Sequence, residues 1–145
     1  MSLTQDQKKT EDIRKELAAA PNLAEYLSEN QEYFPSKSVP ELLEGLYRET
    51  KLSKAEVARR SGMSSVYLHQ IFSGKRNPSR DKLICLCIGM NVELEGVQAL
   101  LKNCGFAELY VKDKRDAVIL FGITHGQSLH EINDTLFDQG VDTLI

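Results

Sequence analysis

The sequence predicts an all-α protein, and three observations support this prediction. Apolar residues recur every three or four positions along most of the chain, which is the spacing of one helix face. No stretch alternates apolar and polar residues over more than about five positions, so strands are not expected. Serine or asparagine often precedes the apolar runs and glycine or proline often follows them, as at helix ends. Together these signals predict about seven to nine helices.

The composition suits one small domain with helical appendages. The chain has 145 residues, of which 41% are hydrophobic and 27% are charged, so it can bury a core. No apolar run approaches the roughly 20 residues of a membrane-spanning helix, and the polar first residues do not resemble a signal peptide. Three cysteines without a close Cys-x-x-Cys pair argue against a disulfide scaffold. We therefore expect a cytoplasmic protein with no membrane partner.

Two helices are expected before residue 38. Ile13 and Leu17 are four residues apart, which predicts a helix that ends before Pro21. Asn22 can cap a second helix, which we expect to stop at Pro35. The apolar residues of that second helix are Leu23, Leu27 and Phe34.

Serine residues mark the starts of four further helices. Ser38, Ser53 and Ser128 are each followed three residues later by glutamate, the pattern of a capping box. Ser79 can cap a helix without that glutamate. The inner face of the helix after Ser38 consists of Leu42, Leu43, Leu46 and Tyr47, and that of the helix after Ser79 consists of Leu83, Leu86, Cys87 and Met90.

Two more helices are expected over residues 94–104 and 115–125, each followed by a glycine that can end it. The second of these is apolar on almost all sides, more than a one-sided surface helix needs. We expect it to be buried on two sides, against residues 10–34 or across a dimer interface. Its apolar residues are Val118, Ile119, Phe121 and Ile123.

Residues 53–73 carry two short helices joined by a sharp turn. Gly62 lies at the turn, where glycine tolerates a positive φ without strain. Ala58, four residues earlier, is small enough for the second helix to pack closely against the first. Leu68 and Ile71 form the inner face of the second helix. This pattern is typical of a helix-turn-helix, whose second helix enters the DNA major groove.

The segment LSKAEVARRSGMSSVYLHQIFSGKRNPSRDKLICLCIGM, residues 52–90, resembles the Cro/repressor-type (XRE) helix-turn-helix domain. The GKRNPS run followed by a capped amphipathic helix is the usual continuation of the motif in that family. The resemblance implies a five-helix DNA-binding unit over about residues 39–105. One departure is Lys54, where the family often has a glutamine that contacts a phosphate. Lysine can also reach a phosphate, but it lacks the fixed geometry of the amide.

A helical projection with Leu68 and Ile71 inward places the DNA-facing side chains, and the resemblance supports their roles. Gln70 can pair with adenine, and Val66 can contact a thymine methyl group. Arg76 lies in the following loop and is expected to bind backbone phosphate alike in all sequences. The expected base-reading residues are Ser65, Val66, His69 and Gln70. The expected phosphate-binding residues are Lys54, Ser64, Ser73, Lys75, Arg76 and Asn77.

The charge distribution favours double-stranded DNA as the partner. The whole chain has a formal net charge of −3, which by itself argues against nucleic acid. Residues 48–82, however, hold nine basic and three acidic residues, a local charge of +6. The remainder has 9 basic and 18 acidic residues, a charge of −9. A positive segment within an acidic protein can steer DNA to one face while limiting non-specific binding.

Two function classes follow from these features. The first is a sequence-specific DNA-binding transcriptional regulator that acts as a homodimer. The second is a protein-interaction module that keeps the helix-turn-helix fold and binds a protein through its acidic flanking helices. We assign residues 1–37 to an N-terminal extension, residues 38–106 to the DNA-binding domain, and residues 107–145 to a C-terminal extension for dimerisation or docking.

No pattern in the sequence indicates catalysis, a cofactor or a metal. The chain lacks a Gly-rich phosphate loop, a nucleophile elbow and a zinc-protease motif. Cys85 and Cys87 are two residues apart on a helix, so their side chains diverge by about 200° and cannot share a metal ion. We therefore expect neither an enzyme nor a metalloprotein.

Overall fold

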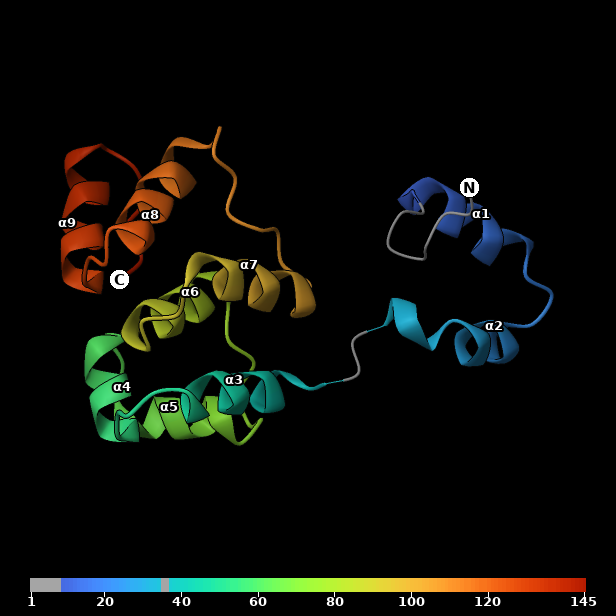
Figure 1. Ribbon diagram of the computed structural model, residues 1–145, viewed down its shortest axis with the longest axis horizontal. Coiled ribbons are helices and arrows are strands. Elements are labelled where there is room, and N and C mark those ends of the chain that lie inside the picture. Colours follow the sequence, from blue (N-terminus) through green and yellow to red (C-terminus); the bar gives the residue numbers. More distant parts are fainter. Residues whose placement is uncertain (1–8, 35–36) are drawn as a thin grey trace. The chain divides into compact units, whose positions relative to one another are not determined.

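A computed structural model of the chain describes residues 9–34 and 37–145. Within these ranges it contains nine α-helices, one short 3-10 helix and no strand (Figure 1). The prediction of an all-α protein is confirmed. The chain forms two compact units, residues 1–36 and residues 37–145. No helix in the described part of the chain is long and apolar enough to cross a bilayer.

The first unit contains α1 (Thr10–Ala19), α2 (Leu23–Glu29) and the 3-10 helix η2 (Gln31–Tyr33). As predicted, Asn22 caps α2, since its Oδ1 accepts the Glu25 N–H at 2.9 Å. The prediction that this helix continues to Pro35 is wrong. Asn30 leaves the helical conformation and donates its side-chain amide to the Tyr26 carbonyl at 2.9 Å. Tyr26 is the buried residue of α2, while Leu23, Leu27 and Phe34 are exposed.

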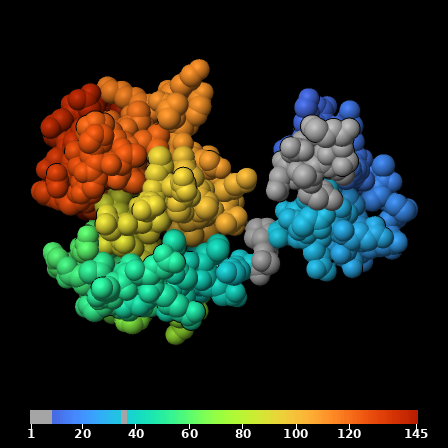
Figure 2. Space-filling view, viewed as in Figure 1, coloured from blue at the N-terminus to red at the C-terminus, as the bar shows by residue number. Residues whose placement is uncertain are grey.

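The second unit is built around one central helix. Its elements are α3 (Val39–Arg48), α4 (Lys54–Arg60), α5 (Ser65–Phe72), α6 (Arg80–Gly89), α7 (Leu94–Asn103), α8 (Lys114–Thr124) and α9 (Leu129–Asp138). Helix α6 packs against α4, α7 and α9, while α5 packs against α3 and α4. Figure 2 shows the yellow atoms of α6 and the start of α7 between the cyan and green α3–α5 region and the orange α8–α9 region.

Helix α6 is buried on every side, whereas the sequence predicts a single inner face. All residues from Leu83 to Met90 are buried, because α4, α7 and α9 surround the helix. The two thiols of α6 lie in this core. Burial raises the pKa of Cys85 to about 11 and that of Cys87 to about 12, since an apolar interior disfavours the thiolate.

Within residues 37–145 the predicted serine caps are present, but only one capping box is reciprocal. Ser38, Ser53, Ser79 and Ser128 each accept a backbone N–H three residues later. At Ser128, the glutamate also accepts the serine backbone N–H, which completes the box. At Ser53 the corresponding glutamate binds an arginine one turn further along α4 instead. A pattern for a cap is therefore not sufficient to fix both of its hydrogen bonds.

Helix α8 finds its neighbours within its own unit. It packs against α7 and α9, and Ile119 at its centre is fully buried. Gly122 lets α9 approach closely, because a Cβ there would lie 2.3 Å from Ile132 Cγ1. Contrary to the prediction of burial, Phe121 is 55% exposed and stacks on His125 at a ring-centroid distance of 3.9 Å.

The predicted DNA-binding domain, residues 38–106, and the predicted C-terminal extension, residues 107–145, lie within one compact unit. Residues 37–145 form one unit because the segment between α7 and α8 is tied back to α7. Gln98 accepts the Leu109 N–H at 2.7 Å and donates to the Leu109 carbonyl at 2.9 Å, and Leu109 is buried. The C-terminal helices are thus part of the body that carries the helix-turn-helix.

Candidate nucleic-acid interface

The turn between α4 and α5 has the geometry that the sequence requires. Gly62 adopts φ +68°, and the Met63 N–H donates to the Ala58 carbonyl at 3.0 Å, which closes the end of α4. Ser64 then caps α5, because its Oγ accepts the Tyr67 N–H at 3.1 Å. Ala58 is buried where the two helices meet. The turn therefore fixes the direction of α5 relative to α4.

Helix α5 buries one face and exposes the other. Leu68 and Ile71 are fully buried in contact with the core. On the outer side, Val66 is 67% exposed, and Ser65 and His69 are also exposed. Gln70, the fourth residue assigned to base reading, is half-buried at the end of the helix. The outer face thus offers short polar and apolar side chains, which suit close approach to base edges.

Among the residues assigned to phosphate binding, the loop after α5 is the most accessible group. Lys75, Arg76 and Asn77 are all exposed there. Ser64 is exposed, and its hydroxyl keeps a proton to donate while it caps α5. Ser73 differs, since its hydroxyl already donates to the Gln70 carbonyl at 3.2 Å. A contact from Ser73 to phosphate requires this hydroxyl to rotate.

Among the predicted site residues, Lys54 differs most from its prediction as a phosphate-binding residue, because its ammonium group already has partners within the protein. Its Nζ lies 3.3 Å from a Glu44 carboxylate oxygen and 3.7 Å from the centroid of the Phe72 ring. The Tyr47 ring is 4.6 Å from the same ammonium group. Lys54 on α4 therefore connects α3 and α5 through an ion pair and two cation–π contacts. Its ammonium group therefore stabilises the packing of α3, α4 and α5 independently of any contact with DNA.

A second cluster joins the end of α5 to the loop that follows it. Arg76 Nε donates to Gln70 Oε1 at 3.0 Å, and the guanidinium lies 5.0 Å from the centroid of the Tyr67 ring. Lys82 of α6 places its Nζ 5.6 Å from the same ring. The sequence places Lys82 in the positive segment 48–82, but it predicts no contact of Lys82 or Tyr67 with Arg76. Their position next to Arg76 follows from the fold of the loop.

Ion pairs within the chain reduce the number of basic side chains whose charge is available to bind DNA. Of the nine basic residues in 48–82, Lys54, Arg59 and Arg80 pair with carboxylates. Those without an ion pair in the described part of the chain are Arg48, Lys51, Arg60, Lys75, Arg76 and Lys82. The last three lie in or beside the loop after α5. Positive charge is therefore available next to the helix with the exposed outer face.

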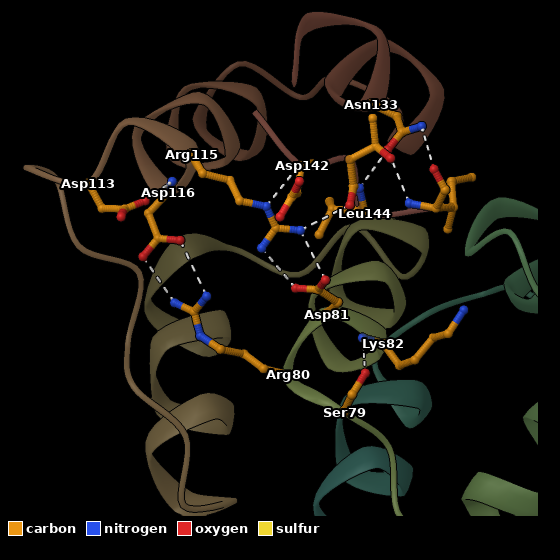
Figure 3. Close-up of polar contacts among 12 residues, drawn as sticks. Ser79, Arg80, Asp81, Lys82, Asp113, Arg115, Asp116, Asn133, Asp142 and Leu144 are labelled. Atoms are coloured by element: carbon orange, nitrogen blue, oxygen red, sulfur yellow. Dashed lines mark hydrogen bonds and ion pairs between the residues drawn. The ribbon is translucent and has the colours of Figure 1, made fainter. Parts of the chain in front are cut away.

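Two crossed ion pairs hold α8 against the start of α6 (Figure 3). Arg80 donates to both carboxylate oxygens of Asp116, at 3.3 and 3.0 Å. Asp81 accepts from both terminal nitrogens of Arg115, at 3.0 and 2.9 Å, and this contact raises the pKa of Arg115. A matching signal is present in the sequence, which has an Arg-Asp dipeptide in the first turn of each helix. The sequence alone does not show that the two dipeptides pair with each other, because this depends on how α6 and α8 lie in the fold.

The C-terminal segment after α9 extends from these two ion pairs to the turn between α4 and α5. Arg115 also donates to the backbone carbonyls of Asp142 and Thr143. Asn133 of α9 accepts the Ile145 N–H at 3.1 Å and donates to the Ile145 carbonyl at 3.0 Å. The Ile145 side chain packs at the turn, 3.1 Å from where a Cβ of Gly62 would lie. The C-terminal segment thus supports the helix-turn-helix at its turn.

Comparisons with known proteins support the assignment of the central segment. Residues 46–97 match a family model described as helix-turn-helix. The match begins in α3, contains α4, α5 and α6, and ends in α7. Neither the curated proteins nor the solved structures include a match to the chain. Residues 46–97 are therefore a helix-turn-helix domain of the Cro/repressor (XRE) type.

Proposed function

We propose that this protein is a sequence-specific DNA-binding transcriptional regulator that inserts α5 into the major groove. The observation that carries the proposal is the exposed outer face of α5, next to a cationic loop. Val66 is 67% exposed on that face, and Lys75 and Arg76 follow it without a carboxylate partner in the described chain. An apolar side chain can contact a thymine methyl group while cations hold the phosphates.

The proposed regulator acts as a homodimer. A single short recognition helix makes few base contacts, and proteins of this architecture gain affinity by binding two half-sites about 34–36 Å apart. Residues 114–145 carry exposed aromatic side chains that suit contact with a second copy. The largest exposures are 55% for Phe121 and 75% for Phe137.

The test is fluorescence anisotropy of labelled duplexes titrated with the full chain over a salt series. We expect a preferred duplex, and a plot of log affinity against log salt with a slope of about −3 or steeper. Lys75→Ala should make that slope less negative by about one unit. Lys102→Ala is the matched control, because Lys102 is an exposed residue of α7 outside the motif loop. Equal affinity for all duplexes, with little dependence on salt, would refute the proposal.

A protein-docking module is the second candidate function. It is favoured by the exposed apolar residues between α7 and α8, where Tyr110 is 57% and Val111 is 70% exposed. These residues lie outside the family match and belong to the acidic C-terminal part of the chain. Absence of DNA binding in the anisotropy series, together with a partner whose binding is lost on Val111→Asp, would favour this function instead.

A further inference from the structure

We propose that Arg76 determines base specificity by holding the side-chain amide of Gln70, in addition to any contact with phosphate. This inference rests on the proposed DNA-binding function and specifies how one end of α5 reads DNA. The sequence alone predicts that Gln70 reads a base and that Arg76 binds phosphate independently. The structure joins the two side chains by a hydrogen bond of 3.0 Å.

The contact fixes the orientation of the Gln70 amide. Arginine Nε is a donor and never an acceptor, so it can bind only the oxygen of the amide. Oε1 of Gln70 therefore faces Arg76, and the Nε2 group with its two N–H donors faces away. A glutamine without such a neighbour can turn its amide to suit either base type. Gln70 is restricted to one orientation for as long as Arg76 stays in place.

Arg76 is itself held in position by the fold of the loop. Gly74 adopts φ +82°, which turns the chain back over the end of α5. The Arg76 backbone N–H then donates to the Gln70 carbonyl at 3.2 Å. The guanidinium lies over the Tyr67 ring, with its carbon 5.0 Å from the ring centroid. No carboxylate in the described chain pairs with Arg76, so its terminal N–H groups remain available to DNA.

The pair presents hydrogen-bond donors to the groove. Adenine recognition by glutamine needs Oε1 as an acceptor for the adenine amino group. Arg76 already donates to that oxygen and draws electron density from it, which weakens it as an acceptor. The outward Nε2 group of Gln70 and the terminal N–H groups of Arg76 instead match the O6 and N7 acceptors of guanine. The pair should therefore select guanine, whereas Gln70 alone would favour adenine.

The test is selection from a pool of duplexes with a randomised segment, performed with the full chain and with variants. We expect wild type to prefer guanine over adenine by about tenfold at one position in each half-site. Arg76→Ala should move the preference at that same position to adenine. Gln70→Ala should weaken the guanine preference to what Arg76 supplies alone, and the double variant should show no preference at that position.

Two further variants separate positioning from simple charge. Arg76→Lys keeps the charge and a donor, but it lacks the planar group that binds Gln70 through Nε while its terminal N–H groups face a base, so it should restore overall affinity with a weaker guanine preference than wild type. Lys75→Ala is the neighbouring control and should weaken all sequences alike. The proposal is overturned if Arg76→Ala leaves the selected sequence unchanged and weakens every duplex equally. If wild type selects no sequence at all, the proposed function fails, and this inference fails with it.

Discussion

Replacing Asp116 with alanine should lower the free energy of unfolding of residues 37–145 by about 3 kcal/mol. Asp116 is only 7% exposed, and both of its carboxylate oxygens accept from Arg80. Without them, a guanidinium whose side chain is 23% exposed loses its counter-charge. The Tyr110 N–H also loses its acceptor, which lies 3.0 Å away. Urea denaturation followed by circular dichroism measures the change.

Two variants distinguish this mechanism from a general effect of lost negative charge. Asp134→Ala removes a carboxylate whose side chain is 66% exposed, and it should change stability by less than about 0.5 kcal/mol. Arg80→Met combined with Asp116→Leu removes both charges and should be less destabilising than Asp116→Ala alone. Equal losses for Asp134→Ala and Asp116→Ala would contradict the assignment of the Arg80–Asp116 pair as a main tie between α6 and α8.

Gly89→Ala should destabilise the same unit by about 2 kcal/mol and also reduce DNA affinity. A Cβ at residue 89 would lie 2.0 Å from Ser61 Oγ and 3.0 Å from Ser61 N. The hydroxyl can rotate, but the backbone nitrogen cannot, so α4 must move away from α6. Because the turn at Gly62 joins α4 to α5, this movement displaces the proposed recognition helix. Thermal unfolding and duplex anisotropy on the same samples measure both effects.

The matched control is the same substitution at another helical glycine. Gly45 lies within α3, and a Cβ added there would meet no neighbouring atom of the described residues within 4 Å, so alanine fits. Gly45→Ala should stabilise the unit by about 0.5–1 kcal/mol, because alanine loses less backbone entropy on folding. A stabilising Gly89→Ala would show that α4 and α6 do not approach each other as closely as the structure indicates.

Local signals in the sequence are sufficient to predict the fold class and most helix ends. The cap at Asn22 and the positive φ at Gly62 depend only on residues within one turn, so the pattern indicates them directly. The predicted second helix is too long, because a stop at Asn30 depends on a side-chain contact to Tyr26. The spacing of apolar residues gives no information on such a hydrogen bond, which competes with continuation of the helix.

Contacts between residues far apart in the sequence explain which features of the candidate site could not be predicted. A charge count places Arg80 within a positive segment, but its partner Asp116 is 36 residues away in the sequence. The motif assigns Lys54 to phosphate, yet Glu44 and the Phe72 ring engage its ammonium group. Counting charges along the chain treats each cation as free, whereas the fold decides which ones are neutralised. The assignments of individual residues to bases and phosphates remain predictions.

NMR spectroscopy of the isotope-labelled protein tests most directly whether α5 and the loop after it read DNA, because each backbone amide gives its own resonance. The full chain is titrated with the duplex recovered by selection from the randomised pool, and each backbone resonance is followed. We predict the largest changes over residues 64–77 and small changes over α9. Changes concentrated on α8 and α9, with residues 64–77 unaffected at saturation, would contradict DNA reading by α5.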